Sequence, residues 1–122
     1  MGEIIYDTTI SAHAISKKNK MRYWKGMVLK DPSIGSYERA LISHFKQTYT
    51  KSPYIQNIKV EITITWKDNR RRDIQNALDI ILDVGQGIIY NDDSQIQEIV
   101  ARKIIEKGKS EIHLIISKGD MP

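Results

Sequence analysis

The chain has no cysteine, so disulfide bonds and thiolate metal sites are excluded and a reducing compartment is the expected setting. No apolar run approaches the roughly 18 residues that a membrane span needs, and no signal-peptide pattern opens the chain. The glycine-rich phosphate loops and the Gly-x-Ser-x-Gly motif are also absent. We therefore expect a soluble cytoplasmic protein with no membrane partner and no cysteine nucleophile.

Length and histidine content narrow the expectation further. With 122 residues, 40% of them hydrophobic and 28% charged, the chain is expected to form one globular domain over residues 1–122. The three histidines are scattered and lack His-Glu-x-x-His spacing. We expect surface or structural roles for them, and no acid–base site built on histidine.

The net charge of +4 is modest, but the charges are segregated. The stretch from Lys17 to Lys30 carries six basic residues and no acid, and a second basic group spans Lys67 to Arg72. Carboxylates then concentrate at positions 73, 79, 83, 92 and 93. This segregation fits a polyanion held by basic residues around an acidic pocket that favours a metal ion.

Hydrophobic periodicity predicts an α+β fold, a single domain with a small mixed β-sheet packed by two main helices. Strands are expected at 3–10 and 58–66, and residues 95–117 are expected to form a β-hairpin. Helices are expected at about 37–48, with Ser33 or Ser36 as the N-cap, and at about 73–84, ended by Gly85 and Gly87. Residues 16–30 lack a period and are interpreted as a loop or an irregular hairpin turning near Gly26.

Two aromatic residues, Tyr23 and Trp24, lie among the lysines of this irregular segment. Such a mixture suits single-stranded or junction DNA, because bases stack on the rings while lysines neutralise phosphates. The alternative is a solvated loop whose two rings pack into the core.

Residues 70–93 carry the strongest chemical pattern. Three arginines lead into Asp73, which is a candidate N-cap, and a second pair of carboxylates follows at Asp92 and Asp93. Helical spacing places Gln75, Asp79 and Asp83 on one polar side. Arginine suits phosphate, and clustered aspartates suit a hard cation such as Mg²⁺, so the pattern indicates chemistry on a phosphodiester. The alternative is a polar helix face followed by an acidic turn.

The same stretch resembles the RusA family of Holliday-junction resolvases. The resemblance rests on Arg71-Arg72-Asp73-x-x-Asn76, then Asp83, then Asp92-Asp93-x-Gln95-Ile96, and it extends to Ser16-Lys17-Lys18-Asn19 and Pro32-Ser33. It implies a RusA-like fold and a homodimeric endonuclease that depends on Mg²⁺, or on Mn²⁺ as an alternative. Such an enzyme binds four-way DNA junctions and nicks two strands symmetrically, in DNA recombination and repair. The resemblance maps a first metal-binding aspartate onto Asp73 and a later one onto Asp93, with Asp92 beside Asp93.

Two positions depart from the family pattern. Gln75 stands where the family has its second aspartate, and Asp79 stands where it has a lysine. We hypothesise that Asp79 replaces the missing carboxylate from one helical turn further on. The predicted catalytic residues are then Asp73, Asp79 and Asp93, and the predicted metal ligands are Asp73, Asp79, Asp92 and Asp93. The rivals are a degenerate site that still binds branched DNA, and an interaction domain with no nucleic-acid role.

The predicted DNA-binding residues are basic or amide side chains from the two basic groups. They are Lys17, Lys18, Asn19, Lys20, Arg22, Arg70, Arg71 and Arg72. The family's lysine needs a replacement near the scissile phosphate, and the sequence leaves open which of residues 17–20 or 70–72 provides it.

Overall fold

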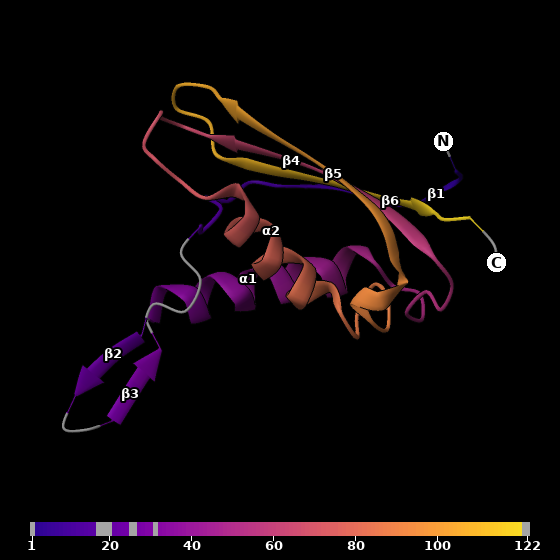
Figure 1. The fold of residues 1–122 in the computed structure, drawn as a ribbon, viewed down its shortest axis with the longest axis horizontal. Coiled ribbons are helices and arrows are strands. Elements are labelled where there is room, and N and C mark those ends of the chain that lie inside the picture. The colour runs from indigo at the N-terminus through magenta and orange to yellow at the C-terminus, as the bar shows by residue number, and fades with distance from the viewer. Residues whose placement is uncertain (1, 17–20, 25–26, 31, 121–122) are drawn as a thin grey trace.

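The computed structural model describes residues 2–16, 21–24, 27–30 and 32–120. A four-stranded sheet has the order β1-β6-β4-β5, and a separate two-stranded sheet pairs β2 with β3 (Figure 1). The strands are β1 Ile4–Ile10, β2 Met21–Trp24, β3 Met27–Lys30, β4 Ile58–Trp66, β5 Ile96–Ile105 and β6 Glu111–Lys118, and the helices are α1 Pro32–Thr48 and α2 Ile74–Gly85.

Strand β4 is the centre of the larger sheet. It pairs antiparallel with β6 and parallel with β5, so the sheet is mixed. Parallel neighbours need a crossover connection, and α2 provides it between β4 and β5. The predicted α+β fold with a small mixed sheet and two main helices is therefore confirmed.

The predicted hairpin over residues 95–117 is wrong. Strand β5 does form at Ile96–Ile105, but it has no hydrogen-bonded register with β6, because β4 lies between them. Strand β6 instead pairs with β1 on one side and β4 on the other. The turn after β5 reverses the chain, as expected for a hairpin. Strand β6 nevertheless lies between β1 and β4, because its alternating apolar residues are buried most fully inside the sheet.

Both helices cover the same face of the sheet (Figure 1). Between the layers lies one hydrophobic core that includes Phe45 of α1, Ile81 of α2, and Ile62 and Trp66 of β4, all at most 1% exposed. Burying a large apolar side chain contributes about 1.5–3 kcal/mol relative to leaving it exposed. This packing fixes α2 against the sheet and so fixes the polar face that α2 presents outward.

The helix boundaries refine two predictions. Helix α1 begins at Pro32, before both Ser33 and Ser36, so neither serine is its N-cap; proline is well tolerated in a first helical turn, where its missing N–H costs nothing. Helix α2 ends at Gly85, as predicted, and Gly87 follows with φ of 81°, a left-handed conformation that favours glycine.

The irregular segment contains the antiparallel β2–β3 hairpin, which confirms the hairpin interpretation and extends away from the main sheet (Figure 1). The predicted turn near Gly26 and the predicted DNA-binding residues Lys17, Lys18, Asn19 and Lys20 lie outside the described residues. For Arg22, Tyr23 and Trp24 the structure describes the backbone strand but not the side chains. The predictions that these side chains contact DNA therefore remain predictions. No helix within the described residues is long and apolar enough to cross a membrane.

Candidate metal centre and its basic flank

Asp73 is the N-cap of α2, as the sequence predicts. Its backbone is extended, and its Oδ1 accepts hydrogen bonds from the backbone N–H groups of Gln75 (2.9 Å) and Asn76 (3.4 Å). A carboxylate here also interacts favourably with the helix dipole. Capping uses one oxygen of Asp73, so this residue has a structural role whatever else it binds.

Gln75, in the first turn of α2, contacts Asp79 one helical turn further on. The Gln75 side-chain amide donates to Asp79 Oδ1 at 3.2 Å. The helical spacing therefore brings the two altered family positions together on one polar face, as predicted. Because an amide is neutral, the contact positions the Asp79 carboxylate without neutralising its charge.

Asp79 lies in an open pocket of about 370 Å³ between α2 and the start of β5. Asp83 and Asp93 line the same pocket, together with Glu98 on the strand side. Asp73 does not; it lines a separate depression with Arg71, Arg72 and Asn76. The structure thus brings Asp79 and Asp93 to a shared pocket, which we call the carboxylate pocket, and places Asp73 outside it.

The loop that carries Asp92 and Asp93 is held by two glutamine side chains. Gln95 Oε1 accepts from the backbone N–H groups of Asn91 (2.8 Å) and Asp92 (2.9 Å), and Gln86 Oε1 accepts from that of Asp93 (3.2 Å). The side-chain amide of Gln95 donates to the carbonyls of Tyr54 and Gln56, both at 2.8 Å. Gln95 is only 9% exposed, so this clamp is an internal part of the fold.

The carboxylates of the loop perturb one another. A hydrogen bond to Asp92, followed by the charges of Asp92 and Asp83, raises the pKa of Asp93 above its usual range. The pKa of Asp92 is lowered, first by the Ser94 hydroxyl at 2.7 Å and then by Asp93. The ionisation of Asp93 is therefore the one that is opposed, a cation would relieve that opposition, and clusters of this kind are typical of functional sites.

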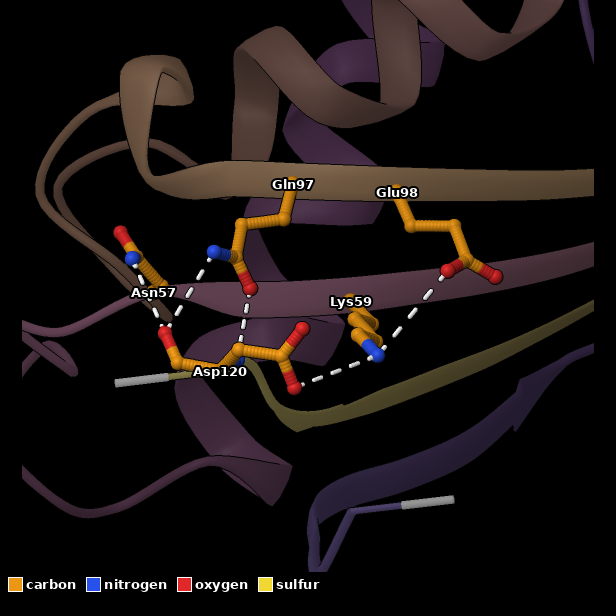
Figure 2. A network of polar contacts seen from close by, with 5 residues as sticks. All are labelled: Asn57, Lys59, Gln97, Glu98 and Asp120. Carbon is orange, nitrogen blue, oxygen red and sulfur yellow. Dashed lines mark hydrogen bonds and ion pairs between the residues drawn. The ribbon is translucent and has the colours of Figure 1, made fainter. Parts of the chain in front are cut away.

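The strand wall of the carboxylate pocket is fixed by a polar network at the start of β5 (Figure 2). Gln97 Oε1 accepts from the backbone N–H of Asp120 at 2.6 Å, and Asn57 donates to the Asp120 carbonyl at 3.2 Å. Lys59 lies between Asp120 (3.6 Å) and Glu98 (4.0 Å). Gln97 and Glu98, which line the pocket, are thereby tied to the chain near its C-terminus.

The side chains of the carboxylate pocket have the right chemistry for a hard divalent cation, but they do not converge on one point. The three aspartates of the carboxylate pocket offer oxygen ligands, which Mg²⁺ and Mn²⁺ prefer, whereas the Glu98 carboxylate is paired with Lys59 on the sheet. Within residues 2–16, 21–24, 27–30 and 32–120, no group of three or more acidic, histidine or cysteine side chains converges closely enough to hold an ion. Asp79, Asp83 and Asp93 are the residues that would hold one. Asp83 was not among the predicted ligands, although its spacing of four residues from Asp79 indicates the shared face.

The three arginines before α2 differ in environment. Arg72 has a side chain only 10% exposed; its Nη2 lies 2.9 Å from Asp68 Oδ1, and its guanidinium lies 5.4 Å from the ring centre of Trp66. Arg70 is 84% exposed, and its Nε lies 3.8 Å from Asp68 Oδ2. Arg71 is exposed and forms no ion pair with the rest of the described chain. Arg70 and Arg71 are therefore the two whose guanidinium groups are presented to solvent, where phosphate would bind.

Two of the three histidines, His44 and His113, form side-chain contacts of the kind expected of structural residues. His44 Nε2 lies 2.6 Å from the Thr8 hydroxyl, and His113 Nε2 lies 2.8 Å from Asp7 Oδ1. His13 lies instead beside the arginines, where partial burial, then Arg72 and Lys67, lower its pKa. None of the three lines the carboxylate pocket.

Comparison with known proteins agrees with the chemistry of this region. The family model described as endodeoxyribonuclease RusA matches residues 12–116. The chain is also 31% identical over 116 residues to the crossover junction endodeoxyribonuclease RusA of Aquifex aeolicus (strain VF5), and the match covers 93% of this chain and 91% of that protein. The matched region contains the carboxylate pocket, the Gln95 clamp and the three arginines.

Proposed function

Because the chain belongs to the RusA family of endodeoxyribonucleases, which resolve Holliday junctions, we propose that it resolves four-way DNA junctions by paired symmetric nicks that depend on Mg²⁺. The observation that carries this proposal is the shared pocket of Asp79, Asp83 and Asp93, two of them on the helix that begins just after the exposed residues Arg70 and Arg71. We further propose that residues 1–122 form a single nuclease domain and that the protein acts in the cytoplasm, in recombination and repair.

Each part of the site has a separate task in this proposal. Asp79 and Asp93 would hold the cation, with Asp83 in the same pocket. Asp92 precedes Asp93 in the loop, and Asp73 caps α2 outside the pocket. A divalent cation held there, Mg²⁺ or Mn²⁺, would supply an activated water and would neutralise charge that builds up on the phosphate. Gln95 and Gln86 hold the backbone of the Asp92-Asp93 loop, so the carboxylates are positioned before DNA binds. No side chain is required as a covalent nucleophile.

DNA binding is assigned to the basic side chains outside the pocket. Arg70 and Arg71 are exposed at the start of α2 and would contact phosphates directly. Lys17, Lys18, Asn19, Lys20 and Arg22 remain predicted contacts of the basic segment. Arg72 is bound to Asp68, so its contribution is to hold the 68–72 turn in shape as well as to add positive charge.

A homodimer is the partner arrangement that best suits two symmetric nicks, because a two-fold axis presents two equal sites. Strand β5 supports it. It is an edge of the sheet, and it leaves Ile99, Ile104 and Ile105 between 40% and 45% exposed. A long apolar edge strand is a template for pairing with another chain. We therefore place the second copy against β5, where it would extend the sheet.

The charges along β5 are self-complementary in an antiparallel pairing centred on Val100. That register places Glu98 opposite the second copy's Arg102, and the two-fold axis repeats the pair. Glu98 lies 4.0 Å from Lys59 of β4, and Arg102 lies 3.2 Å from Glu61 of β4. Lys59 and Glu61 are two residues apart on a strand and so face the same side of the sheet, and Glu98 and Arg102 therefore project from that side too. Opposite charges directly across two strands stabilise the pairing, and like charges destabilise it.

Charge reversal at β5 tests the dimer. Arg102→Glu is expected to shift the protein towards monomer, measured by light scattering coupled to size-exclusion chromatography, because the new carboxylate would repel Glu98 of the other copy at both symmetric positions. The double variant Glu98→Arg/Arg102→Glu is expected to restore the dimer, although it disrupts the ion pairs to Lys59 and Glu61 within the chain. A dimer unaffected by the single change, or not restored by the double one, would place the interface elsewhere.

The proposed function is tested with a synthetic four-way junction. In Mg²⁺ the protein is expected to give two nicks at symmetric positions, mapped on denaturing gels, while a linear duplex of the same sequence stays intact. The lack of three converging carboxylates within the described residues favours a second candidate, a branched-DNA-binding protein with a degenerate site. Binding without nicking over a range of Mg²⁺ and Mn²⁺ concentrations would establish that second candidate. Binding that ignores salt would exclude both, because phosphate contacts release counterions.

A further inference from the structure

Tyr37 of α1 has a buried hydroxyl group that donates no hydrogen bond within the described residues. The residue is 7% exposed, and its buried hydroxyl has no hydrogen-bond acceptor there. Burial raises the pKa of Tyr37, and a weak hydrogen bond from the Ile15 backbone opposes the rise only in part, so the hydroxyl stays protonated and its own hydrogen is the unpaired group. Buried polar groups in native proteins are nearly always paired, and an exception calls for an explanation, such as a ligand that completes the pairing.

Tyr37 lines a second pocket, of about 600 Å³, which we call the arginine pocket, and its hydroxyl is buried behind that lining. Its wall is apolar at Ala14 and Ile15, and its other lining residues are His13, Ser16, Ser33, Tyr37, Arg70, Arg71 and Arg72. No carboxylate of the described residues lines it. The volume is within the range of small-molecule sites, which combine an apolar surface with a few convergent polar groups. An apolar wall, a buried donor and guanidinium groups suit a planar ring attached to an anion.

The arginine pocket lies next to the start of α2. The depression that contains Asp73 and Asn76 shares Ser16, Arg71 and Arg72 with it. From Asp73, helix α2 leads to Asp79 and the carboxylate pocket, at about 1.5 Å per residue. A strand whose phosphate reaches these aspartates therefore has its neighbouring nucleotides within reach of the arginine pocket.

Resting on the proposed function, we propose that the arginine pocket binds one unstacked nucleotide of the junction, next to the phosphate that is cut. Its base lies against Ala14 and Ile15 and accepts a hydrogen bond from Tyr37, while Arg70 and Arg71 bind its phosphate. Bases at a branch point unstack at lower cost than bases within a duplex. Tyr37 is then a residue that determines which base is preferred beside the nick.

Tyr37→Phe isolates this role, because it removes only the hydroxyl group. The melting temperature of the free protein is expected to stay the same or rise, since an unpaired buried hydroxyl is replaced by an apolar group of similar shape. With junctions randomised on both sides of the nick, the base preference of the wild type is expected to fall by about two- to tenfold, the range for one neutral hydrogen bond.

Tyr49→Phe is the matched control. The Tyr49 hydroxyl donates to the Ser52 carbonyl at 3.1 Å and lies outside the arginine pocket. This variant is expected to lower the melting temperature slightly and to leave the base preference unchanged. Equal base preference in wild type and Tyr37→Phe, in an enzyme that does cut junctions, would overturn the proposal.

Binding without cleavage gives an independent readout. With 2-aminopurine placed at one position at a time around the branch, wild-type protein is expected to raise the fluorescence at one position, and Tyr37→Phe is expected to reduce that rise. If no junction is cut but the fluorescence rises, the nuclease proposal fails and the pocket proposal stands. A junction that is cut with no rise at any position would contradict the pocket alone.

Discussion

Replacing Asp93 with Asn is expected to lower Mg²⁺-dependent junction cleavage by about 10²–10³-fold, the typical cost of losing one group that stabilises transition-state charge. Asp93 lines the carboxylate pocket, and Asp92 and Asp83 raise its pKa, so it lies where negative charge is most concentrated. An amide keeps the shape of the side chain but is a poor ligand for a hard cation. The measurement is the single-turnover nicking rate on a synthetic four-way junction.

Binding to the same junction separates this effect from a loss of structure. Removing a negative charge beside DNA is expected to leave affinity unchanged or to increase it, in a gel-shift assay without divalent cations. Glu106→Gln is the matched control, because Glu106 is an exposed carboxylate in the turn after β5, paired with Lys109 at 3.5 Å. Nicking by Asp93→Asn at the rate of the control would show that Asp93 is not part of the site.

Replacing Gln95 with Leu is expected to lower the free energy of unfolding by about 2–6 kcal/mol, because four hydrogen bonds are lost and each contributes roughly 0.5–1.5 kcal/mol. The four partners are backbone groups of Tyr54, Gln56, Asn91 and Asp92, and the side chain that joins them is 9% exposed. Leucine fills similar volume but pairs with none of them. Urea denaturation followed by circular dichroism measures the change.

Two further variants identify the cause of this destabilisation. Gln47→Leu changes the same residue type at an exposed site, where its side-chain hydrogen bond to Ser43 at 3.2 Å is replaceable by water; a change within about 0.5 kcal/mol is expected. Gln95→Glu keeps the acceptor for Asn91 and Asp92 but places a buried carboxylate oxygen against the carbonyls of Tyr54 and Gln56, so a loss at least as large as that of Gln95→Leu is expected at neutral pH. Equal stability of Gln95→Leu and wild type would contradict the clamp.

Local patterns predicted the elements well because local physics determines them. The strict alternation of β4 and the apolar stripe of α2 were correct to within about two residues, and Asp73 is the N-cap that its position suggested. The pairing of β5 with β6 was wrong because a turn specifies only that the chain reverses. Strand order depends on which strand fills the middle of the sheet, and residues far apart in sequence decide that.

The site was predictable in composition but less so in arrangement. The chain segment that carries the aspartates was identified from its charges, yet the division between Asp73 and the carboxylate pocket follows from the way α2 packs on the sheet. The role of Gln95 depends on Tyr54 and Gln56, which lie far earlier in the chain, and no local pattern indicates such partners. The unpaired hydroxyl of Tyr37 is equally invisible in sequence, where the helical spacing of Tyr37 indicates simply a core residue.

The central claim is that Asp79 replaces the carboxylate that Gln75 lacks, and direct titration with Mn²⁺ tests it most directly. By isothermal calorimetry, Asp79→Asn is expected to bind Mn²⁺ about 10–100-fold more weakly than wild type, the range for disturbing the shell around a metal. Gln75→Ala is the comparison on the same helix face, and it is expected to weaken Mn²⁺ binding by less than Asp79→Asn does, because its amide positions Asp79 and is not itself a ligand. An Asp79→Asn variant that binds Mn²⁺ and cleaves junctions as well as wild type would contradict the claim.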